Sequence, residues 1–147
     1  PNVKLLHVGR SKYFSKEKSG IIQISNLDNI EMSLYLSACN LFWLPFQNTN
    51  ANAGRLPLKL SDYLTIGRPV VSTSIGDIPD LINKYEFGLI ASDNPRNIAE
   101  KVYTIYSNPD LQRTMSENGM MLSKSNKENW TARASALEDF YKFLLKH

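Results

Sequence analysis

The segment from Gly54 to Val71 carries the signals for a loop, a helix, a turn and a buried strand in direct succession. Pro57 suits the first turn of a helix, because the amide hydrogen that proline lacks would have no partner there, and Gly67 suits the helix end. The run that follows, 69–73, has the composition of a strand. Many α/β domains contain such a unit, so the segment predicts a helix that leads directly into a sheet.

The rest of the chain alternates in the same way between strand-like and helix-like segments. Short apolar runs bounded by glycine or polar residues predict the strands, and apolar residues at helical spacing predict the helices. Such alternation favours an α/β fold in which helices cover both faces of a parallel sheet. The expected strands are 3–8, 21–24, 41–45, 69–73 and 87–91, and the expected helices are 30–39, 57–66, 94–106, 110–124 and 130–145.

Two of these helices have apolar residues at helical spacing on one side, and for the last helix this stripe predicts packing against the core. In the helix 30–39, which starts near the capping candidate Asn29, the shared face contains Ile30, Leu34 and Ala38. The stripe of the last helix contains Ala134, Leu137, Phe140, Tyr141 and Leu144.

Composition limits the class of protein. A chain of 147 residues with 42% hydrophobic content can bury one sizeable core, and its net charge of +3 is too small and too scattered to indicate nucleic-acid binding. Cys39 has no second cysteine to pair with, which favours an inert thiol in a reducing compartment. No apolar run has the length of a membrane span, and the N-terminus does not resemble a signal peptide. We therefore expect a cytoplasmic protein that does not bind nucleic acid.

The predicted start of the helix at Pro57 suits an anion. Backbone N–H groups at Leu56 and Leu58 would face an open loop, with the positive charges of Arg55 and Lys59 beside them, and such a helix end can bind phosphate. Asp62 follows one turn later, where a carboxylate could accept hydrogen bonds from a ribose. Most helices that begin with proline and end with glycine bind nothing at their start, so the spacing alone leaves both interpretations open.

Four loops would lie at one edge of the predicted sheet. In open parallel sheets, ligands bind beyond the carboxyl ends of the strands. The loops 9–11, 25–28, 46–55 and 74–79 all follow strands, and the longest of them leads into the helix start with Arg55 and Lys59. Turn residues are needed at every strand end, but the shared edge favours a binding site there.

Several linked motifs resemble the C-terminal, nucleotide-sugar-binding domain of family 4 glycosyltransferases, which have the GT-B architecture. That family has Pro-x-Lys, an acid three residues further on, a helix that ends in Gly-Lys/Arg-Pro-Val-Val, then Gly-Gly-x-Pro-Glu and Gly-Leu. It also has Ala-Asp-Val-Phe-Val-Leu-Pro upstream and Asn-Pro-Glu-Leu downstream. The matching segments follow the family's order and cover nearly the whole chain: 38–45, 57–71, 76–82, 87–90 and 108–111.

The resemblance implies a Rossmann-like, three-layer domain with a mostly parallel sheet and extra C-terminal helices. Residues 1–147 would form this single donor-binding domain, as a fragment of a two-domain enzyme. The full-length protein would be a hexosyltransferase-like enzyme that moves a sugar from a nucleotide-diphosphate sugar to a glycan, lipid or other acceptor, as in polysaccharide biosynthesis. The fragment alone would be inactive. No metal or cofactor is implied, and no catalytic residue is assigned.

The resemblance also implies roles for individual residues. Asp62 matches the acid that holds the ribose hydroxyls, although the family usually has Glu there. The diphosphate would bind to the loop and helix start, and the base to the loop after the second strand. The diphosphate residues are Gly54, Arg55, Leu56, Leu58 and Lys59, and the base residues are Ser25, Asn26 and Leu27.

The chain departs from the family in two ways. Many members carry an earlier acid, whose place here is taken by Gly54, so the donor sugar stays open. The family's domain also begins with a strand and helix that have no counterpart before Val3. A missing central strand would leave backbone groups unpaired in the sheet. We expect either that the strand 3–8 moves beside 41–45, or that a second molecule fills the slot in a homodimer formed by strand exchange.

The sequence also leaves other partners and other functions open. The acceptor domain lies outside this chain, and the full-length protein could touch a membrane peripherally. An epimerase on the same scaffold would need acids and a His near the diphosphate, and a non-catalytic interaction module could use the helices after Asn108. A response-regulator-like domain would need paired acids after its first strand, where the chain has Gly9, Arg10 and Ser11.

Overall fold

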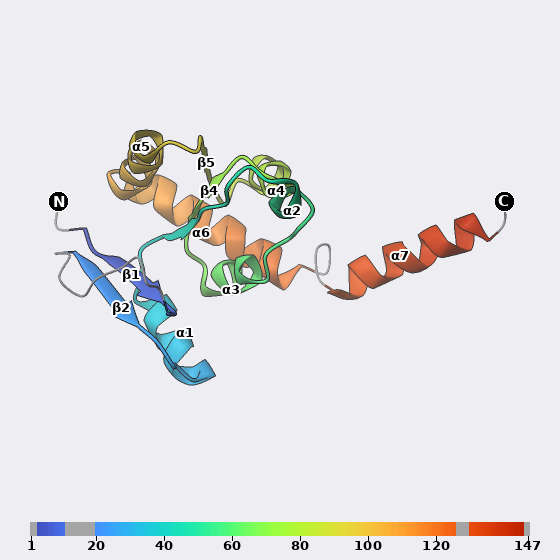
Figure 1. Cartoon of the computed structure of the whole chain (residues 1–147), viewed down its shortest axis with the longest axis horizontal. Coiled ribbons are helices and arrows are strands. Elements are labelled where there is room, and N and C mark those ends of the chain that lie inside the picture. Colours follow the sequence, from blue (N-terminus) through green and yellow to red (C-terminus); the bar gives the residue numbers. More distant parts are fainter. Residues whose placement is uncertain (1–2, 11–19, 126–129, 146–147) are drawn as a thin grey trace. The chain divides into compact units, whose positions relative to one another are not determined.

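The computed structural model describes residues 3–10, 20–125 and 130–145. The chain divides into two compact units, Pro1–Cys39 and Asn40–His147, which are described separately below (Figure 1). Whether 1–147 acts as a single domain stays a prediction. None of the helices described is both long enough and apolar enough to cross a membrane.

The first unit pairs two short parallel strands and adds one helix. Strand β1 (Leu5–Val8) pairs with β2 (Ile21–Ile24), with Leu5 opposite Ile21. Helix α1 (Asn29–Ser37) is capped by Asp28, one residue earlier than the expected cap at Asn29. The Asp28 carboxylate accepts hydrogen bonds from the backbone N–H groups of Ile30 and Glu31, both at 2.8 Å, and Glu31 accepts one from the Asp28 amide. This reciprocal pair is a capping box, which fixes where the helix begins.

Helix α1 does not bury all of its apolar residues. Ile30 and Leu34 are 74% and 67% exposed within the described structure, whereas Met32 and Leu36 are half-buried. The helix forms where the spacing predicts it, but Ile30 and Leu34 lie on its exposed side. A two-stranded sheet offers little surface for a helix to cover, so only part of an apolar helix can be buried there.

The second unit contains a three-stranded parallel sheet in the order β3-β4-β5. The predicted α/β fold with parallel strands and additional C-terminal helices is confirmed. The strands are β3 (Phe42–Leu44), β4 (Val70–Thr73) and β5 (Gly88–Ala91), and the helices are α2 (Asn50–Ala53), α3 (Lys59–Ile66), α4 (Ile78–Tyr85), α5 (Pro95–Tyr106), α6 (Pro109–Lys124) and α7 (Trp130–Leu144).

The core of this unit lies around β4. Every residue of β4 is buried, as expected for a strand covered on both faces of a parallel sheet. Helices α4 and α5 pack against β4 and β5, and α6 packs against α3, α4 and α5. Met115 of α6 joins a buried cluster with Val71, Ala91 and Ile105, so this methionine serves packing.

The backbone ladders define the strand pairs inside each unit. Within the described residues, β1 pairs with β2 in the first unit and β3 pairs with β4 in the second. A place for the strand 3–8 beside 41–45 would join the two units and stays a prediction. Backbone bonds from Leu5 to Gly20 and from Gly9 to Ile24 extend the β1–β2 ladder at both ends, so that edge of β1 is already used.

The last helix forms as predicted, but its apolar stripe is not buried. Leu137, Phe140, Tyr141 and Leu144 are all more than half exposed. No described element covers these side chains, so their predicted role in the core is wrong for the chain as described.

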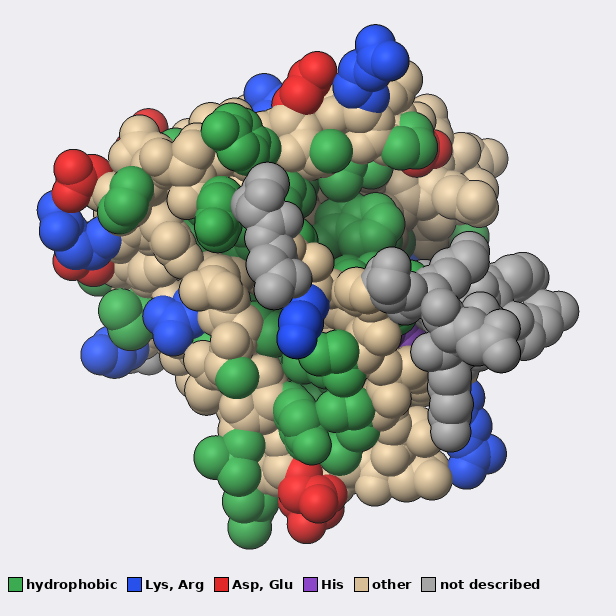
Figure 2. Space-filling model, turned by 90° about the vertical axis from the view of Figure 1, so that its left-hand side faces the viewer, with side chains coloured by type: hydrophobic (Ala, Val, Ile, Leu, Met, Phe, Trp, Pro, Cys, Tyr) green, Lys and Arg blue, Asp and Glu red, His purple; other side chains and the backbone are tan. Residues whose placement is uncertain are grey.

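Charged side chains are distributed without a clear basic patch on the face drawn in Figure 2. There the described Lys and Arg side chains are scattered around groups of hydrophobic ones, and Asp and Glu lie among them. This distribution agrees with the small net charge of +3 and gives no support to a nucleic-acid surface on that face.

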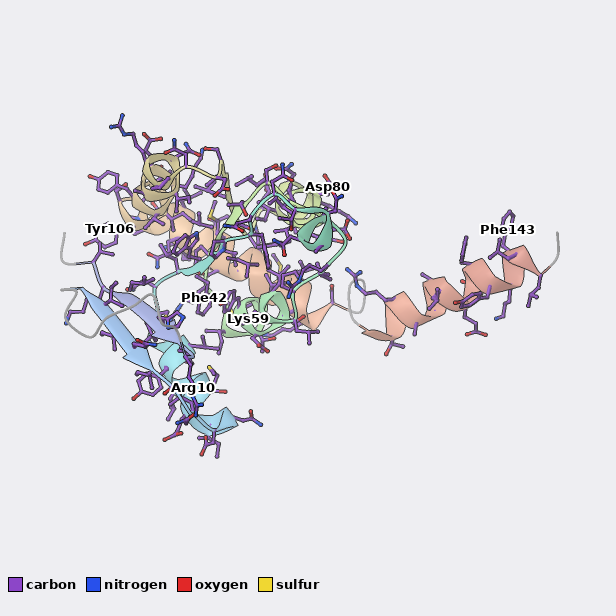
Figure 3. All side chains as sticks on the ribbon, in the orientation of Figure 1. Arg10, Phe42, Lys59, Asp80, Tyr106 and Phe143 are labelled. Carbon is purple, nitrogen blue, oxygen red and sulfur yellow. The ribbon has the colours of Figure 1, made fainter. Side chains whose placement is uncertain are left out.

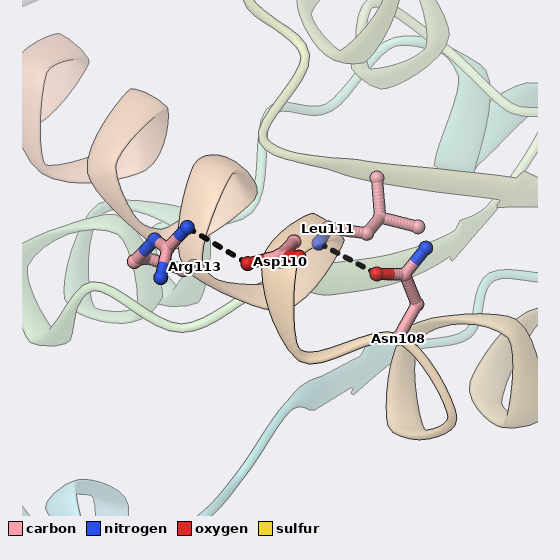
Figure 4. A network of polar contacts seen from close by, with 4 residues as sticks. All are labelled: Asn108, Asp110, Leu111 and Arg113. Carbon is pink, nitrogen blue, oxygen red and sulfur yellow. Dashed lines mark hydrogen bonds and ion pairs between the residues drawn. The ribbon is translucent and has the colours of Figure 1, made fainter.

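The segment Asn108-Pro109-Asp110-Leu111 forms the cap and the first turn of α6. The Asn108 side chain accepts a hydrogen bond of 3.0 Å from the backbone N–H of Leu111, and Pro109 occupies the first helical turn (Figure 4). Arg113 and Asp110 form an ion pair of 2.8 Å, but their side chains are 68% and 84% exposed. The cap therefore contributes more to stability than the ion pair.

We predict that Asn108→Ala lowers the free energy of unfolding by about 1 kcal/mol, because it removes the cap of α6. The control Arg113→Ala breaks only the exposed ion pair and should cost less than about 0.5 kcal/mol. Urea denaturation of the two variants measures both values. Equal losses would contradict the assignment of the cap as the stronger contact.

Gly88 is the residue whose replacement should harm the sheet most. A Cβ atom at this position would overlap the carbonyl oxygen of Val70 on the paired strand. We expect Gly88→Ala to cost at least about 2 kcal/mol of unfolding free energy. Gly54→Ala is the control for folding alone, since a Cβ there would lie 3.8 Å from the carbonyl oxygen of Asn50, an ordinary van der Waals contact. A stable Gly88→Ala variant would show that β4 and β5 can separate without penalty.

Candidate functional site

The loop between β3 and α3 is held by its own side chains. Thr49 caps the short helix α2, and the side-chain amide of Asn52 donates to the carbonyl oxygen of Gln47 at 2.9 Å. Gly54 ends α2. The loop therefore has a defined path between the sheet and the next helix.

Arg55 is placed by two contacts. Its guanidinium carbon lies 5.6 Å from the centre of the Phe46 ring, and its Nη1 donates to the Asn52 side-chain oxygen at 3.4 Å. Arg55 is nevertheless exposed. A cation held over an aromatic ring keeps its charge and loses some of its freedom, so Arg55 offers a positioned positive charge on this loop.

Helix α3 has an open start. It begins at Lys59, after Leu58, which provides no side-chain cap. Pro57 lies one residue before that cap position, so its predicted place inside the first turn is wrong. The carbonyl oxygens of Pro57 and Leu58 accept from the amides of Leu60 and Ser61 at 3.1 and 3.0 Å. Within the described part of the chain, the backbone amides of Leu56, Leu58 and Lys59 donate no hydrogen bond to another residue.

The body of α3 is fixed to the sheet and ends as predicted. Leu60 and Leu64 are buried, and the Tyr63 ring stacks on Phe42 of β3 with 4.0 Å between ring centres. Gly67 ends the helix with a left-handed backbone, φ 71°. Rigid packing of the helix fixes the direction in which its open start points.

Asp62 lies in the first turn of this helix and is exposed. It follows Lys59 by three residues, a spacing that puts both side chains on neighbouring positions of the helix surface. Figure 3 labels Lys59 at the start of α3. The structure thus places a carboxylate just behind the helix start, with two cations, Arg55 and Lys59, close to it in the sequence.

Sequence patterns did not single out the contact between α2 and the loop after β4. Gly76 has a positive φ of 62°, and a Cβ atom there would lie 3.0 Å from the carbonyl oxygen of Ala53. A larger residue would push this loop away from the end of α2. Gly76, in the segment Gly76-Asp77-Ile78-Pro79, was the sequence signal for this contact. The sequence does not tell, however, which backbone group such a glycine approaches.

The three residues expected to contact the base, Ser25, Asn26 and Leu27, lie in the first unit. They follow β2, and Asn26 has a positive φ of 60°. The side chain of Arg10, which follows β1, donates to the Asn26 side-chain oxygen at 3.1 Å. The structure therefore brings the loops after β1 and β2 together. The residues expected to bind the diphosphate belong to the second unit.

Metal-binding clusters are not found among the described residues. No group of three or more His, Cys, Asp and Glu side chains there could hold a metal ion. Cys39 is half-buried, and its thiol lies 3.4 Å from the carbonyl oxygen of Tyr35.

Comparison with known families decides the class of protein. The model of the family described as glycosyl transferases group 1 matches residues 1–108. The chain belongs to this family. The match spans β1 to the end of α5 and includes every residue of the candidate site, while α6 and α7 lie beyond it.

A similar sequence is known from an archaeal glycosyltransferase. This chain is 23% identical to an uncharacterized glycosyltransferase of Methanocaldococcus jannaschii, over 97% of this chain and 41% of that protein. This chain thus spans about two fifths of the length of that relative.

Similar solved structures confirm the fold. A sucrose-phosphate synthase from Thermosynechococcus elongatus superposes with a TM-score of 0.73 at 20% identity, over 97% of this chain and 39% of that one. Anabaena HepE, solved in complex with UDP, gives a TM-score of 0.64 at 14% identity, over 84% of this chain and 32% of that one. The chain has the Rossmann-like fold of one half of a GT-B glycosyltransferase, as the motifs predicted.

Proposed function

We propose that the chain is the donor-binding half of a glycosyltransferase that moves a sugar from a nucleotide-diphosphate sugar to a glycan, lipid or other acceptor. The observation that carries this proposal is the uncapped start of α3, with Arg55 before it, Lys59 at its first residue and Asp62 behind it. Membership of the glycosyl transferases group 1 and the fold support it.

The diphosphate would bind at the helix start. Backbone amides of Leu56, Leu58 and Lys59 can donate to phosphate oxygens, and the helix dipole favours negative charge there. When the bond to the sugar breaks, negative charge grows on the leaving diphosphate, and prepositioned donors stabilise that charge. Arg55 and Lys59 add charge of the required sign. These amides and cations would stabilise the diphosphate by themselves, without a bound metal ion.

Asp62 would accept hydrogen bonds from the two ribose hydroxyls. A carboxylate has two oxygens that accept only, which matches a pair of neighbouring hydroxyl donors. The loop of Ser25, Asn26 and Leu27 would contact the base through backbone groups. Gly54 ends α2 without a side chain, so the donor sugar would receive no carboxylate from that position.

The complete enzyme would require an acceptor-binding part besides this chain. We therefore propose that the 147-residue chain binds a donor nucleotide weakly and transfers no sugar by itself. An epimerase would need a His near the diphosphate, and the segment from β3 to Asp62 contains none. A hexosyltransferase of polysaccharide biosynthesis, working in the cytoplasm, is the function that we favour.

We predict that the chain binds UDP or GDP and that Asp62→Ala weakens this binding about tenfold to a hundredfold, because hydrogen bonds to a charged group are lost. Isothermal titration calorimetry measures the affinities. Thr65→Ala, an exposed position on the same helix, serves as the control and should bind like the unaltered chain. Absence of heat with both nucleotides at millimolar concentration would contradict the proposed site, and an unchanged Asp62→Ala affinity would contradict the ribose role.

We also propose that two copies of the chain associate by strand exchange. In the described structure β3 has β4 as its only ladder partner, and β1 has only β2. A parallel strand with an open edge presents unpaired N–H and C=O groups to another chain. Sedimentation equilibrium should therefore give twice the monomer mass of 16.7 kDa. A monomeric mass at high concentration would contradict strand exchange, while leaving the nucleotide site unaffected.

A further inference from the structure

The geometry points to Thr73 as a positioning residue that holds Arg55 in place through Phe46. The inference rests on the proposed function, because Arg55 is the cation assigned there to the donor diphosphate. Thr73 itself would touch no ligand: it is the last residue of β4 and only 2% exposed.

Beyond the last β3–β4 backbone pair, the Thr73 hydroxyl replaces the backbone groups that would bond to Phe46 in a longer ladder. Its Oγ1 donates to the carbonyl oxygen of Phe46 at 2.8 Å and accepts from the Phe46 amide at 2.9 Å. In a continued parallel ladder, Phe46 would instead exchange these bonds with the carbonyl of Thr73 and the amide of Ile75. Those two groups bond to each other at 3.0 Å. One side chain therefore satisfies both backbone groups of Phe46.

Both contacts of Arg55 depend on the segment that Thr73 fixes. The Phe46 ring lies under the guanidinium, 5.6 Å from ring centre to Cζ. The other contact comes from Asn52, which in turn donates to the carbonyl oxygen of Gln47, the next residue. A shift of the backbone at residues 46 and 47 would move both supports of Arg55 at once.

Ser72 offers a matched comparison in the same strand. It is fully buried, and its hydroxyl donates to the carbonyl oxygen of Leu44 at 3.0 Å, with a longer contact of 3.3 Å to the carbonyl oxygen of Thr73. Both contacts stay within strands β3 and β4 and reach neither Phe46 nor Arg55. Loss of the Ser72 hydroxyl tests what removing a buried hydrogen bond does to the fold, without loosening the loop.

The test compares Thr73→Val, Thr73→Ser and Ser72→Ala in the 147-residue chain. Thr73→Val keeps the volume but leaves the amide and carbonyl of Phe46 unpaired, and we expect UDP affinity to fall about tenfold. Thr73→Ser keeps the hydroxyl and should restore binding. Ser72→Ala should lower thermal stability without changing affinity. In an Arg55→Ala background, Thr73→Val should cause no further loss, because residues that act as one unit are not additive.

A second measurement does not depend on any ligand. The Phe46 ring current should shift the NMR signals of the Arg55 side-chain protons, and the shift should persist in Thr73→Ser and Ser72→Ala but collapse in Thr73→Val. An unchanged shift in Thr73→Val overturns the inference even if UDP affinity falls. A collapsed shift in a chain that binds no nucleotide supports the Thr73–Phe46–Arg55 linkage and overturns the proposed function instead.

Discussion

Complete burial of β4 is the constraint on which the second unit depends. Val70 and Val71 are wholly enclosed, so helices must cover both faces of the strand, and its neighbours β3 and β5 must satisfy its backbone groups. The two polar residues at its end, Ser72 and Thr73, are equally enclosed, and each hydroxyl bonds to the neighbouring strand or the loop after it. The end of the buried strand thereby sets the path of the loop that carries the candidate site.

Local sequence signals predicted most of the elements, because those signals act over a few residues, but α2 and α4 were not among the expected helices. Gly67 ends α3 as predicted, since the backbone conformation at a helix end is decided within one turn. Burial was harder to predict, because it depends on what lies opposite. The stripes on α1 and α7 have helical spacing, yet Leu34 and Phe140 are exposed where no described element covers them.

The candidate site could be predicted in part for the same reason. Arg55, Lys59 and Asp62 are close in sequence, so their proximity follows from one helix start. The bond between Thr73 and Phe46 joins residues 27 positions apart, and the approach of Gly76 to Ala53 joins two loops. Such contacts are fixed by strand register and loop path, and hydrophobic periodicity carries no information about either.

The uncapped start of α3 has a thermodynamic consequence. A Ser, Asp or Asn at the cap position usually stabilises a helix by about 1 kcal/mol, but Leu58 cannot supply that hydrogen bond. The helix therefore lacks this stabilising hydrogen bond when nothing is bound at its start. An anion that accepts from the open amides of Leu58 and Lys59 would stabilise the helix start from outside the chain, so that binding would add to the stability of this helix.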